Sequence, residues 1–228
     1  HLVDNLINTV DVFGLHFASL DIRQDSSIHN KVLEAIAAKT DILPKNYAEL
    51  SEEEKKKLLY KASGDIGGHV FEDGIEKDTL LSIKAIKEIQ QYNGVEGCSR
   101  YIISQCNSAL NLLEVYGLFK LCGWKNEDLT IDIVPLFETI DDLQEAADIM
   151  GELYENEIYR KHLQKRNNRQ TIMLGFSDGT KDGGYLMANW SIYKAKEKLT
   201  SISAKYGIDV VFFDGRGGLP ERHAGREI

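Results

Sequence analysis

The sequence contains few cysteines, no long apolar segment and fewer basic than acidic residues. Cys98, Cys106 and Cys122 are odd in number and lack C-x-x-C spacing, so neither a disulfide framework nor a zinc site is expected. No apolar run approaches the roughly 18 residues that cross a membrane. The first residues, His1-Leu-Val-Asp-Asn5, lack the basic and then apolar order of a signal peptide. We therefore expect reduced, partly buried thiols and a cytoplasmic protein that does not enter a membrane.

Charge and size narrow the class of protein. The 27 lysines and arginines against 36 aspartates and glutamates give a formal net charge of -9. Such a chain is not expected to bind nucleic acid, where affinity rests on neutralising phosphates, although a local basic pocket can still hold a small anion. Its 228 residues, 43% of them hydrophobic, suffice for one large soluble domain or two small ones. The chain opens on His1 instead of Met, and we expect it to be part of something longer.

Strand and helix patterns alternate along the chain. Apolar or alternating segments predict strands at 13–22, 101–104, 129–134, 170–174 and 208–213. Helical spacing of apolar residues predicts helices over 3–12, 26–37, 79–89, 110–121, 143–154 and 185–206, and the capping box from Ser51 to Glu54 begins a further short helix. Successive strand–helix units with short connections imply parallel strands. Five strands fit either an α/β barrel or an open, flavodoxin-like sheet.

The positions of the residues that could take part in catalysis or binding favour the barrel, because each of them follows a predicted strand. The carboxyl-end face of the strands is where α/β barrels carry their active sites. With five strands instead of eight, the prediction is a partial (β/α)8 TIM-type barrel with additional helices, spanning residues 1–222, with 223–228 as a divergent or truncated tail. The residues that follow strands are Arg23, Ser104, Gln105, Glu138, Asp178, Lys181 and Arg216.

The stretch Leu174-Gly-Phe-Ser-Asp-Gly-Thr-Lys-Asp-Gly-Gly184 is the strongest candidate for an active-site turn. It lies between an apolar strand pattern and a long helical one. Its glycines permit a tight path that brings main-chain N–H groups close to a ligand, and Asp178 and Lys181 offer a metal ligand and a cation. An ordinary surface loop with an Asp-Gly turn is the alternative.

Two carboxylates at the ends of neighbouring predicted strands, Glu138 and Asp178, suit a hard divalent cation. Mg²⁺ and Mn²⁺ take oxygen ligands and are often held by one or two protein carboxylates, with substrate oxygens and water completing the shell. The alternative is that each carboxylate caps the helix that follows it. Spacing alone leaves both possibilities open.

The end of the chain, Asp214-Gly-Arg-Gly-Gly-Leu-Pro-Glu-Arg222, is a second glycine-rich segment after a strand. Arg216 and Arg222 are fork-shaped donors of the kind that bind phosphate bidentately, and Arg23 is a candidate third. A basic pocket in an acidic protein indicates a small anionic substrate. No role is assigned to His16 or His29. The tryptophans Trp124 and Trp190 and the tyrosines Tyr101 and Tyr193 are predicted to lie in the core.

At these residues the sequence resembles the phosphoenolpyruvate carboxylases over nearly its whole length. The matching segments occur in the family's order. They are Phe13-Gly-Leu15, Leu20-Asp-Ile-Arg-Gln24, Tyr101-Ile-Ile-Ser104, Val134-Pro-Leu-Phe-Glu138, Gly175-Phe-Ser-Asp-Gly-Thr-Lys-Asp-Gly-Gly184, Trp190, Tyr193-Lys-Ala195 and Gly215-Arg-Gly-Gly218.

The resemblance implies a homo-oligomeric α/β barrel enzyme that joins bicarbonate to phosphoenolpyruvate, giving oxaloacetate and phosphate, with Mg²⁺ or Mn²⁺ and without biotin. Glu138 and Asp178 match the family's metal ligands. Arg23 and Arg216 match its arginines for the substrate phosphate, and Arg222 matches the next arginine of its glycine-rich loop. Lys181 would add positive charge beside them, so that Arg216, Arg222 and Lys181 form the expected catalytic set.

The chain also departs from the family. Asp214 stands where the family has His, and His223-Ala-Gly-Arg-Glu-Ile228 replaces the expected Gly-Gly run. Family members are several times longer, and their upstream histidine, downstream arginines and effector-binding helices have no match here. Three hypotheses follow: a catalytic-barrel portion of a carboxylase, a non-catalytic fragment that keeps the fold and weak ligand affinity, or an unrelated phosphate-handling barrel such as an aldolase.

Overall fold

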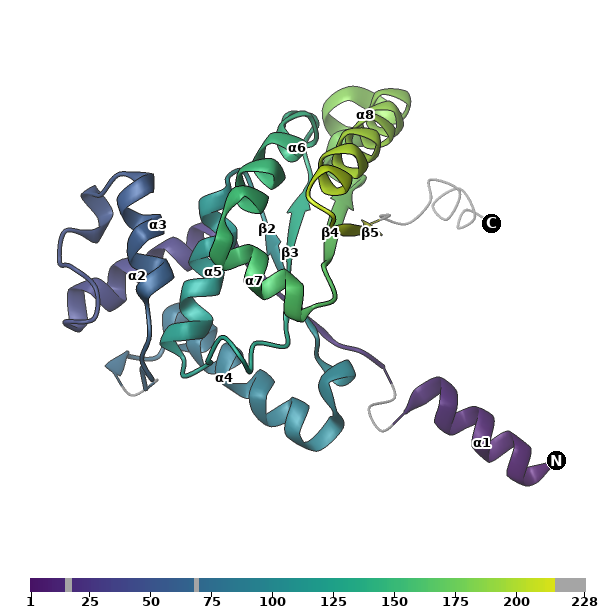
Figure 1. The fold of residues 1–228 in the computed structure, drawn as a ribbon, viewed down its shortest axis with the longest axis horizontal. Coiled ribbons are helices and arrows are strands. Elements are labelled where there is room, and N and C mark those ends of the chain that lie inside the picture. Colours follow the sequence, from purple (N-terminus) through teal and green to yellow (C-terminus); the bar gives the residue numbers. More distant parts are fainter. Residues whose placement is uncertain (15–17, 68–69, 216–228) are drawn as a thin grey trace, which may run out of the picture. The chain divides into compact units, whose positions relative to one another are not determined.

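The computed structural model describes residues 1–14, 18–67 and 70–215, and for residues 177–183 the backbone alone. Helices and strands alternate through most of this range (Figure 1). In chain order the elements are α1 (Leu2–Phe13), β1 (Asp21–Asp25), α2 (Ser26–Lys39), η1 (Tyr47–Glu49), α3 (Glu52–Lys61), α4 (Ile75–Asn93), η3 (Val95–Gly97), β2 (Arg100–Ser104), α5 (Ala109–Leu121), β3 (Asp132–Phe137), α6 (Ile140–Glu155), α7 (Glu157–Lys165), β4 (Arg169–Gly175), α8 (Ser177–Lys205) and β5 (Asp209–Gly215).

The five strands form one sheet in the order β1-β2-β3-β4-β5. The pairings of β3 with β4 and of β4 with β5 are parallel, and the latter runs from Arg169 opposite Asp209 to Gly175 opposite Gly215. Spatial order follows chain order, as in consecutive strands of an α/β barrel, whereas a flavodoxin-like sheet has the order 2-1-3-4-5. The α/β class is therefore confirmed, and the strand order is consistent with part of a barrel.

The chain divides into two compact units. Unit 1 comprises His1–Ile102 and Leu113–Ile133, and unit 2 comprises Ile103–Leu112 and Val134–Ile228. Because the boundaries fall inside β2, α5 and β3, these three elements contribute residues to both units.

The core of unit 1 combines aliphatic helix faces with a row of aromatic rings. On α4 the predicted face is confirmed, because its buried residues are Thr79, Leu80, Ile83 and Ile86. Tyr101 meets Phe119 edge-on at 5.5 Å between ring centroids, and Phe119 meets Trp124 at the same distance. Edge-to-face pairs of this kind add to the stabilisation from buried area.

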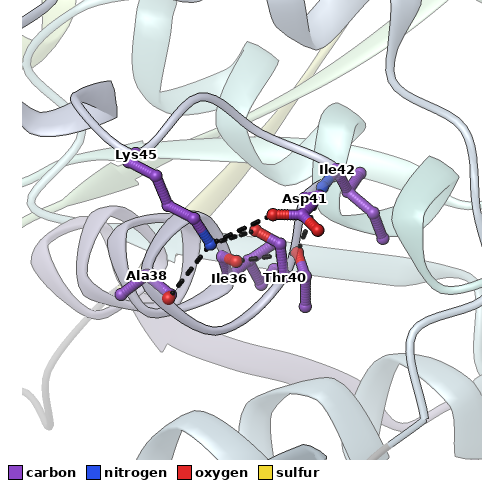
Figure 2. Close-up of polar contacts among 6 residues, drawn as sticks. All are labelled: Ile36, Ala38, Thr40, Asp41, Ile42 and Lys45. Atoms are coloured by element: carbon purple, nitrogen blue, oxygen red, sulfur yellow. Dashed lines mark hydrogen bonds and ion pairs between the residues drawn. The ribbon is translucent and has the colours of Figure 1, made fainter.

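Lys45 caps the carboxyl end of α2 (Figure 2). Its Nζ donates to the carbonyl oxygens of Thr40 at 2.9 Å and Ala38 at 3.3 Å, and it forms an ion pair with Asp41 at 3.4 Å. The Thr40 hydroxyl donates to the Ile36 carbonyl at 2.8 Å. The last carbonyl groups of a helix have no partner within the helix, so these bonds satisfy the end of α2.

Unit 2 packs α6 against α8 (Figure 1). Gly151 on α6 faces Ile202, and a methyl group added at Gly151 would lie 3.4 Å from the Ile202 Cγ1, which is an ordinary contact. The α8 helix is interrupted at Gly184, which has φ 78° and ψ 167°. A left-handed φ is available to glycine at little cost, so Gly184 separates a short first segment from the long second segment that begins at Tyr185.

Two predicted strands begin later in the structure than their sequence pattern indicated. The strand predicted at 13–22 is wrong in its first part, because α1 continues to Phe13 and β1 starts at Asp21. The strand predicted at 129–134 lies instead at Asp132–Phe137. In both cases the strand begins where a neighbour supplies hydrogen bonds: Leu20 N–H donates to the Gly97 carbonyl at 2.9 Å and Asp132 N–H to the Ser99 carbonyl at 2.7 Å.

Several apolar side chains are exposed. None of the α1 residues is buried by the described part of the chain, and Leu2, Val3 and Leu6 are 87%, 68% and 64% exposed. The predicted core position of Trp124 is confirmed, but that of Trp190 is wrong, because Trp190 is 56% exposed and stacks on the equally exposed Tyr193. Among the described residues no helix has both the length and the apolar character needed to cross a membrane.

Candidate functional site

The carboxyl ends of β3, β4 and β5 lie level with one another in unit 2. Phe137, the last residue of β3, is opposite Leu174 of β4, so that Glu138 follows at the level of Gly175. Gly175 is in turn opposite Gly215 at the end of β5. This edge therefore brings one carboxylate next to Gly175, a residue without a side chain.

Glu138 is fixed by the start of the next helix. Thr139 caps α6, because its side chain accepts a hydrogen bond from Asp142 N–H at 3.1 Å while Asp142 accepts one from Thr139 N–H at 3.0 Å. The same oxygen, Asp142 Oδ2, also accepts from Glu138 N–H at a longer distance of 3.4 Å. The idea that Glu138 itself caps this helix is therefore wrong. Its carboxylate remains half-buried at the edge of the sheet.

The residue after β2 contributes a main-chain donor to this carboxylate. Gln105 N–H donates to Glu138 Oε2 at 3.3 Å. Gln105 has φ 55°, a left-handed conformation that is uncommon for residues other than glycine. Sequence reasoning placed Gln105 after the second strand, which the structure confirms, but nothing in the sequence indicated its backbone conformation or its bond to Glu138.

The structure describes the other candidate residues to different extents. Arg23 was predicted to follow the first strand, but it is the central, exposed residue of β1, since that strand begins only at Asp21. Asp178 and Lys181 lie in the first segment of α8, directly after β4, and only their backbone is described. Arg216 and Arg222, together with the tail 223–228, lie outside the described residues.

The predicted turn at 174–184 is largely helical. The α8 helix begins at Ser177 with Phe176 at the N-cap position, and only Gly184 departs from helical geometry. Asp178 is therefore not at the cap position, contrary to the alternative considered from the sequence. A helix whose amino end follows a strand directly presents main-chain N–H groups at that strand's carboxyl end, as the turn was expected to do.

The three cysteines do not take part in this edge as nucleophiles. All are free and buried, which confirms reduced thiols. Burial raises the pKa of the Cys106 thiol far above its usual range and that of Cys122 to about 12, so both stay protonated. The Cys106 thiol is also directed at the Ser108 carbonyl, at 3.9 Å. His29, to which no role was assigned, is a buried residue of unit 1, and His16 lies outside the described residues.

The donor chemistry of this edge fits a divalent cation. A carboxylate oxygen at a strand end is the ligand that Mg²⁺ and Mn²⁺ prefer, and these ions commonly use only one or two protein carboxylates. Gly175 allows Glu138 to pack closely against β4, since a methyl group at Gly175 would lie 3.1 Å from both Cα and Cγ of Glu138. Within the described ranges no cluster of three or more His, Cys, Asp or Glu residues forms a self-contained metal site. A site here would therefore need substrate or water oxygens as further ligands.

Comparison with known proteins identifies the family of the chain. The family model described as phosphoenolpyruvate carboxylase matches residues 1–226. The chain belongs to the phosphoenolpyruvate carboxylase family. The resemblance seen in the sequence is thereby confirmed, and the unrelated aldolase-like barrel considered as an alternative is excluded.

Two curated relatives carry the name phosphoenolpyruvate carboxylase. The chain is 38% identical to that of Nitrosomonas europaea over 97% of its own length and 24% of the relative's. It is 37% identical to that of Nitrosomonas eutropha over 98% of its own length and 25% of the relative's. The chain thus spans about a quarter of the length of the curated relatives it matches.

Proposed function

We propose that this chain supplies the metal-binding and part of the phosphate-binding portion of a phosphoenolpyruvate carboxylase. The enzyme would add bicarbonate to phosphoenolpyruvate, giving oxaloacetate and phosphate, and would do so without biotin, as a cytoplasmic homo-oligomer. The observation that carries the proposal is the position of Glu138 at the carboxyl edge of the sheet, one strand away from the start of α8, where Asp178 lies. Family membership supports the lyase class.

In this proposal the residues of the chain bind and orient. Glu138 and Asp178 would hold Mg²⁺ or Mn²⁺, which supplies positive charge that stabilises the oxygens of the substrate as they become more negative. Arg23, Arg216 and Arg222 would bind the phosphoryl group bidentately, and Lys181 would add a further cation beside it. The phosphoryl group would leave the enol oxygen of phosphoenolpyruvate for a bicarbonate oxygen. The resulting enolate carbon would then attack the carboxyl carbon, with release of phosphate.

The first test is Mn²⁺ binding to the 228-residue chain, with Glu138→Gln and Asp178→Asn as site variants. Each removes one anionic ligand while nearly conserving volume, so we expect at least a tenfold loss of Mn²⁺ affinity. Glu145→Gln is the matched control, since Glu145 is an exposed carboxylate on α6. Equal affinity of the wild type and both site variants would reject the metal assignment.

A non-catalytic fragment with weak ligand binding is the second candidate, and the quarter-length match to the relatives favours it. Oxaloacetate formation with bicarbonate and Mn²⁺ separates the two candidates, with Asp178→Asn as background. We expect the chain alone not to turn over phosphoenolpyruvate at the rate of a complete enzyme. Robust activity that Asp178→Asn abolishes would instead show a self-sufficient enzyme.

A further inference from the structure

We propose that Gly175 and the main-chain amide of Gln105 are positioning elements that fix the Glu138 carboxylate at the carboxyl edge of unit 2. This inference rests on the proposed metal-binding function of Glu138 and deepens it. Neither residue would touch the substrate or the metal. Each would act through Glu138, one by leaving space and the other by donating a hydrogen bond.

Gly175 is required for space and not for backbone freedom. Its φ does not lie in the left-handed region, so an alanine at this position meets no conformational penalty of that kind. An added Cβ would, however, lie 3.1 Å from Glu138 Cα, 3.1 Å from Cγ and 3.4 Å from Cβ. The first two distances are shorter than ordinary carbon–carbon contacts, so Glu138 would have to move.

The main chain of Glu138 has little freedom to yield. On its amino side Phe137 is held in register with Leu174, and on its carboxyl side the Thr139–Asp142 capping box begins α6. A methyl group at Gly175 is therefore expected to displace the Glu138 side chain. Displacements of a fraction of an ångström to one ångström at a ligand are enough to weaken a metal site that demands regular geometry.

The Gln105 amide is held on an equally rigid support. Cys106, the next residue, is fully buried, and Asn111 Oδ1 accepts hydrogen bonds from Asn107 N–H at 3.1 Å and from Ser108 N–H at 3.2 Å. This loop ties the end of β2 to the start of α5. The left-handed conformation of Gln105 costs on the order of 1 kcal/mol or more and persists only where its surroundings impose it. Here it delivers an N–H group to Glu138 Oε2.

The contact can be tested without metal by comparing the Gln105 amide resonance in ¹H–¹⁵N NMR spectra of the wild type and its variants at one neutral pH. We expect this resonance to shift in Glu138→Gln, because a charged hydrogen-bond acceptor is replaced by a neutral one. We expect it to shift in Gly175→Ala as well, because the added methyl group displaces the carboxylate. Gly151→Ala is the matched control, because its added methyl group meets only Ile202 at ordinary contact distance. The control should behave as the wild type.

Mn²⁺ affinity is the second measurement. We expect Gly175→Ala to weaken Mn²⁺ binding about tenfold while its NMR spectrum stays that of a folded chain, and Gly151→Ala to leave the affinity unchanged. If the Gln105 amide resonance is the same in Glu138→Gln as in the wild type, the proposed role of the amide is rejected. A Gly175→Ala chain that binds Mn²⁺ as Gly151→Ala does, or that no longer folds, overturns the role of Gly175.

The two proposals fail in different ways. If Glu138→Gln binds Mn²⁺ as the wild type does, while the Gln105 resonance still reports Glu138 and Gly175→Ala still alters it, then the metal assignment fails and the positioning contact stands. If Mn²⁺ binding requires Glu138 but neither the Mn²⁺ affinity of Gly175→Ala nor the Gln105 amide resonance shows the expected change, the metal assignment stands and the positioning inference is rejected.

Discussion

Two regions of the molecule, one in each unit, place titratable groups in opposite surroundings. In unit 1, His29 is fully buried with its Nε2 2.9 Å from the Tyr101 hydroxyl, and Glu114 on α5 is 1% exposed and accepts from Asn30 at 3.1 Å. At the carboxyl edge of unit 2, Glu138 is instead half-buried at a strand end, where it accepts from the Gln105 N–H and lies beside a glycine.

The difference separates structural from functional polar groups. A buried polar group that is hydrogen-bonded to its neighbours specifies packing, and changing its charge costs stability. A carboxylate that is only partly buried at a strand end can still gain a ligand. Unit 1 is therefore expected to respond to mutation and pH through stability, and the edge of unit 2 through binding.

Acid should destabilise unit 1 through His29, and this is the largest effect we expect. Burial lowers the pKa of His29 from 6.5 to about 4, with Asp25 opposing the shift. An unfolded histidine binds a proton near pH 6.5, while the folded one resists until about pH 4. Above pH 6.5 His29 is neutral in both states and the free energy of unfolding is at its full value. As the pH falls from 6.5 towards 4, only the unfolded state binds the proton, and the free energy of unfolding drops by roughly 3 kcal/mol in total.

The measurement is the free energy of unfolding from urea melts between pH 7 and pH 4. His29→Gln removes the titration and keeps a polar partner for the Tyr101 hydroxyl, so its stability should change less steeply over this range even though it starts lower. Parallel pH profiles of His29→Gln and wild type would show that His29 is not the titrating group, and the contrast between the units would lose its strongest support.

Two helix glycines sharpen the comparison of packing density. A methyl group at Gly117 in unit 1 would lie 2.6 Å from the Cδ2 and 3.3 Å from the Cβ of the buried Leu59, whereas one at Gly151 in unit 2 meets Ile202 at 3.4 Å. We expect Gly117→Ala to destabilise by about 2 kcal/mol through overpacking, despite better helix propensity. Gly151→Ala should be neutral or slightly stabilising.

Thermal and urea unfolding of both variants measure this difference. Combining Gly117→Ala with Leu59→Ala gives a double-mutant cycle, in which the added methyl group should fill part of the space left by the truncated leucine. A combined effect equal to the sum of the single effects would contradict the proposed overlap.

Elements with strong local patterns were predictable from the sequence, whereas their junctions were not. The α4 face and the Ser51 capping box follow from spacing and side-chain chemistry within one turn. The start of β1 at Asp21 depends on the Gly97 carbonyl, 77 positions after Leu20, which periodicity does not reveal. The carboxyl end of β3 was also not predicted. The strand continues through Pro135, although proline is normally a poor residue for a paired strand.

The position of Glu138 was predictable, but what holds it in place was not. That Glu138 follows a strand and that a long helical segment begins at Tyr185 could be inferred from the local sequence, whereas the helical segment before Gly184 was predicted to be a turn. The bond from Gln105 could not, because a left-handed glutamine has no sequence signal. Gly175 is the last residue of β4, and a glycine at a strand end facing a carboxylate is a signal that could have been used.

The smallest expected effect compares the two capping boxes. In unit 1 the Ser51 Oγ accepts from Glu54 N–H at 3.4 Å and Ser51 N–H donates to Glu54 Oε2 at 3.0 Å, while Thr139 and Asp142 form the same pair in unit 2. Ser51→Ala and Thr139→Ala each remove the side-chain acceptor at a helix amino end, so each should cost about 1 kcal/mol of stability. Ser51→Ala also removes the bond from the Ser51 hydroxyl to Glu54 Oε2 at 2.7 Å, so its loss should be at least as large. Urea unfolding measures both losses.

Only Thr139→Ala should also change binding, because Thr139 adjoins Glu138 and its cap fixes the main chain on the carboxyl side of that ligand. We expect Mn²⁺ affinity to fall about threefold in Thr139→Ala and to stay unchanged in Ser51→Ala at an equal or larger loss of stability. If a general loss of stability lowered Mn²⁺ affinity, Ser51→Ala would weaken binding at least as much as Thr139→Ala. An unchanged Thr139→Ala affinity would instead mean that strand register alone holds Glu138 in place.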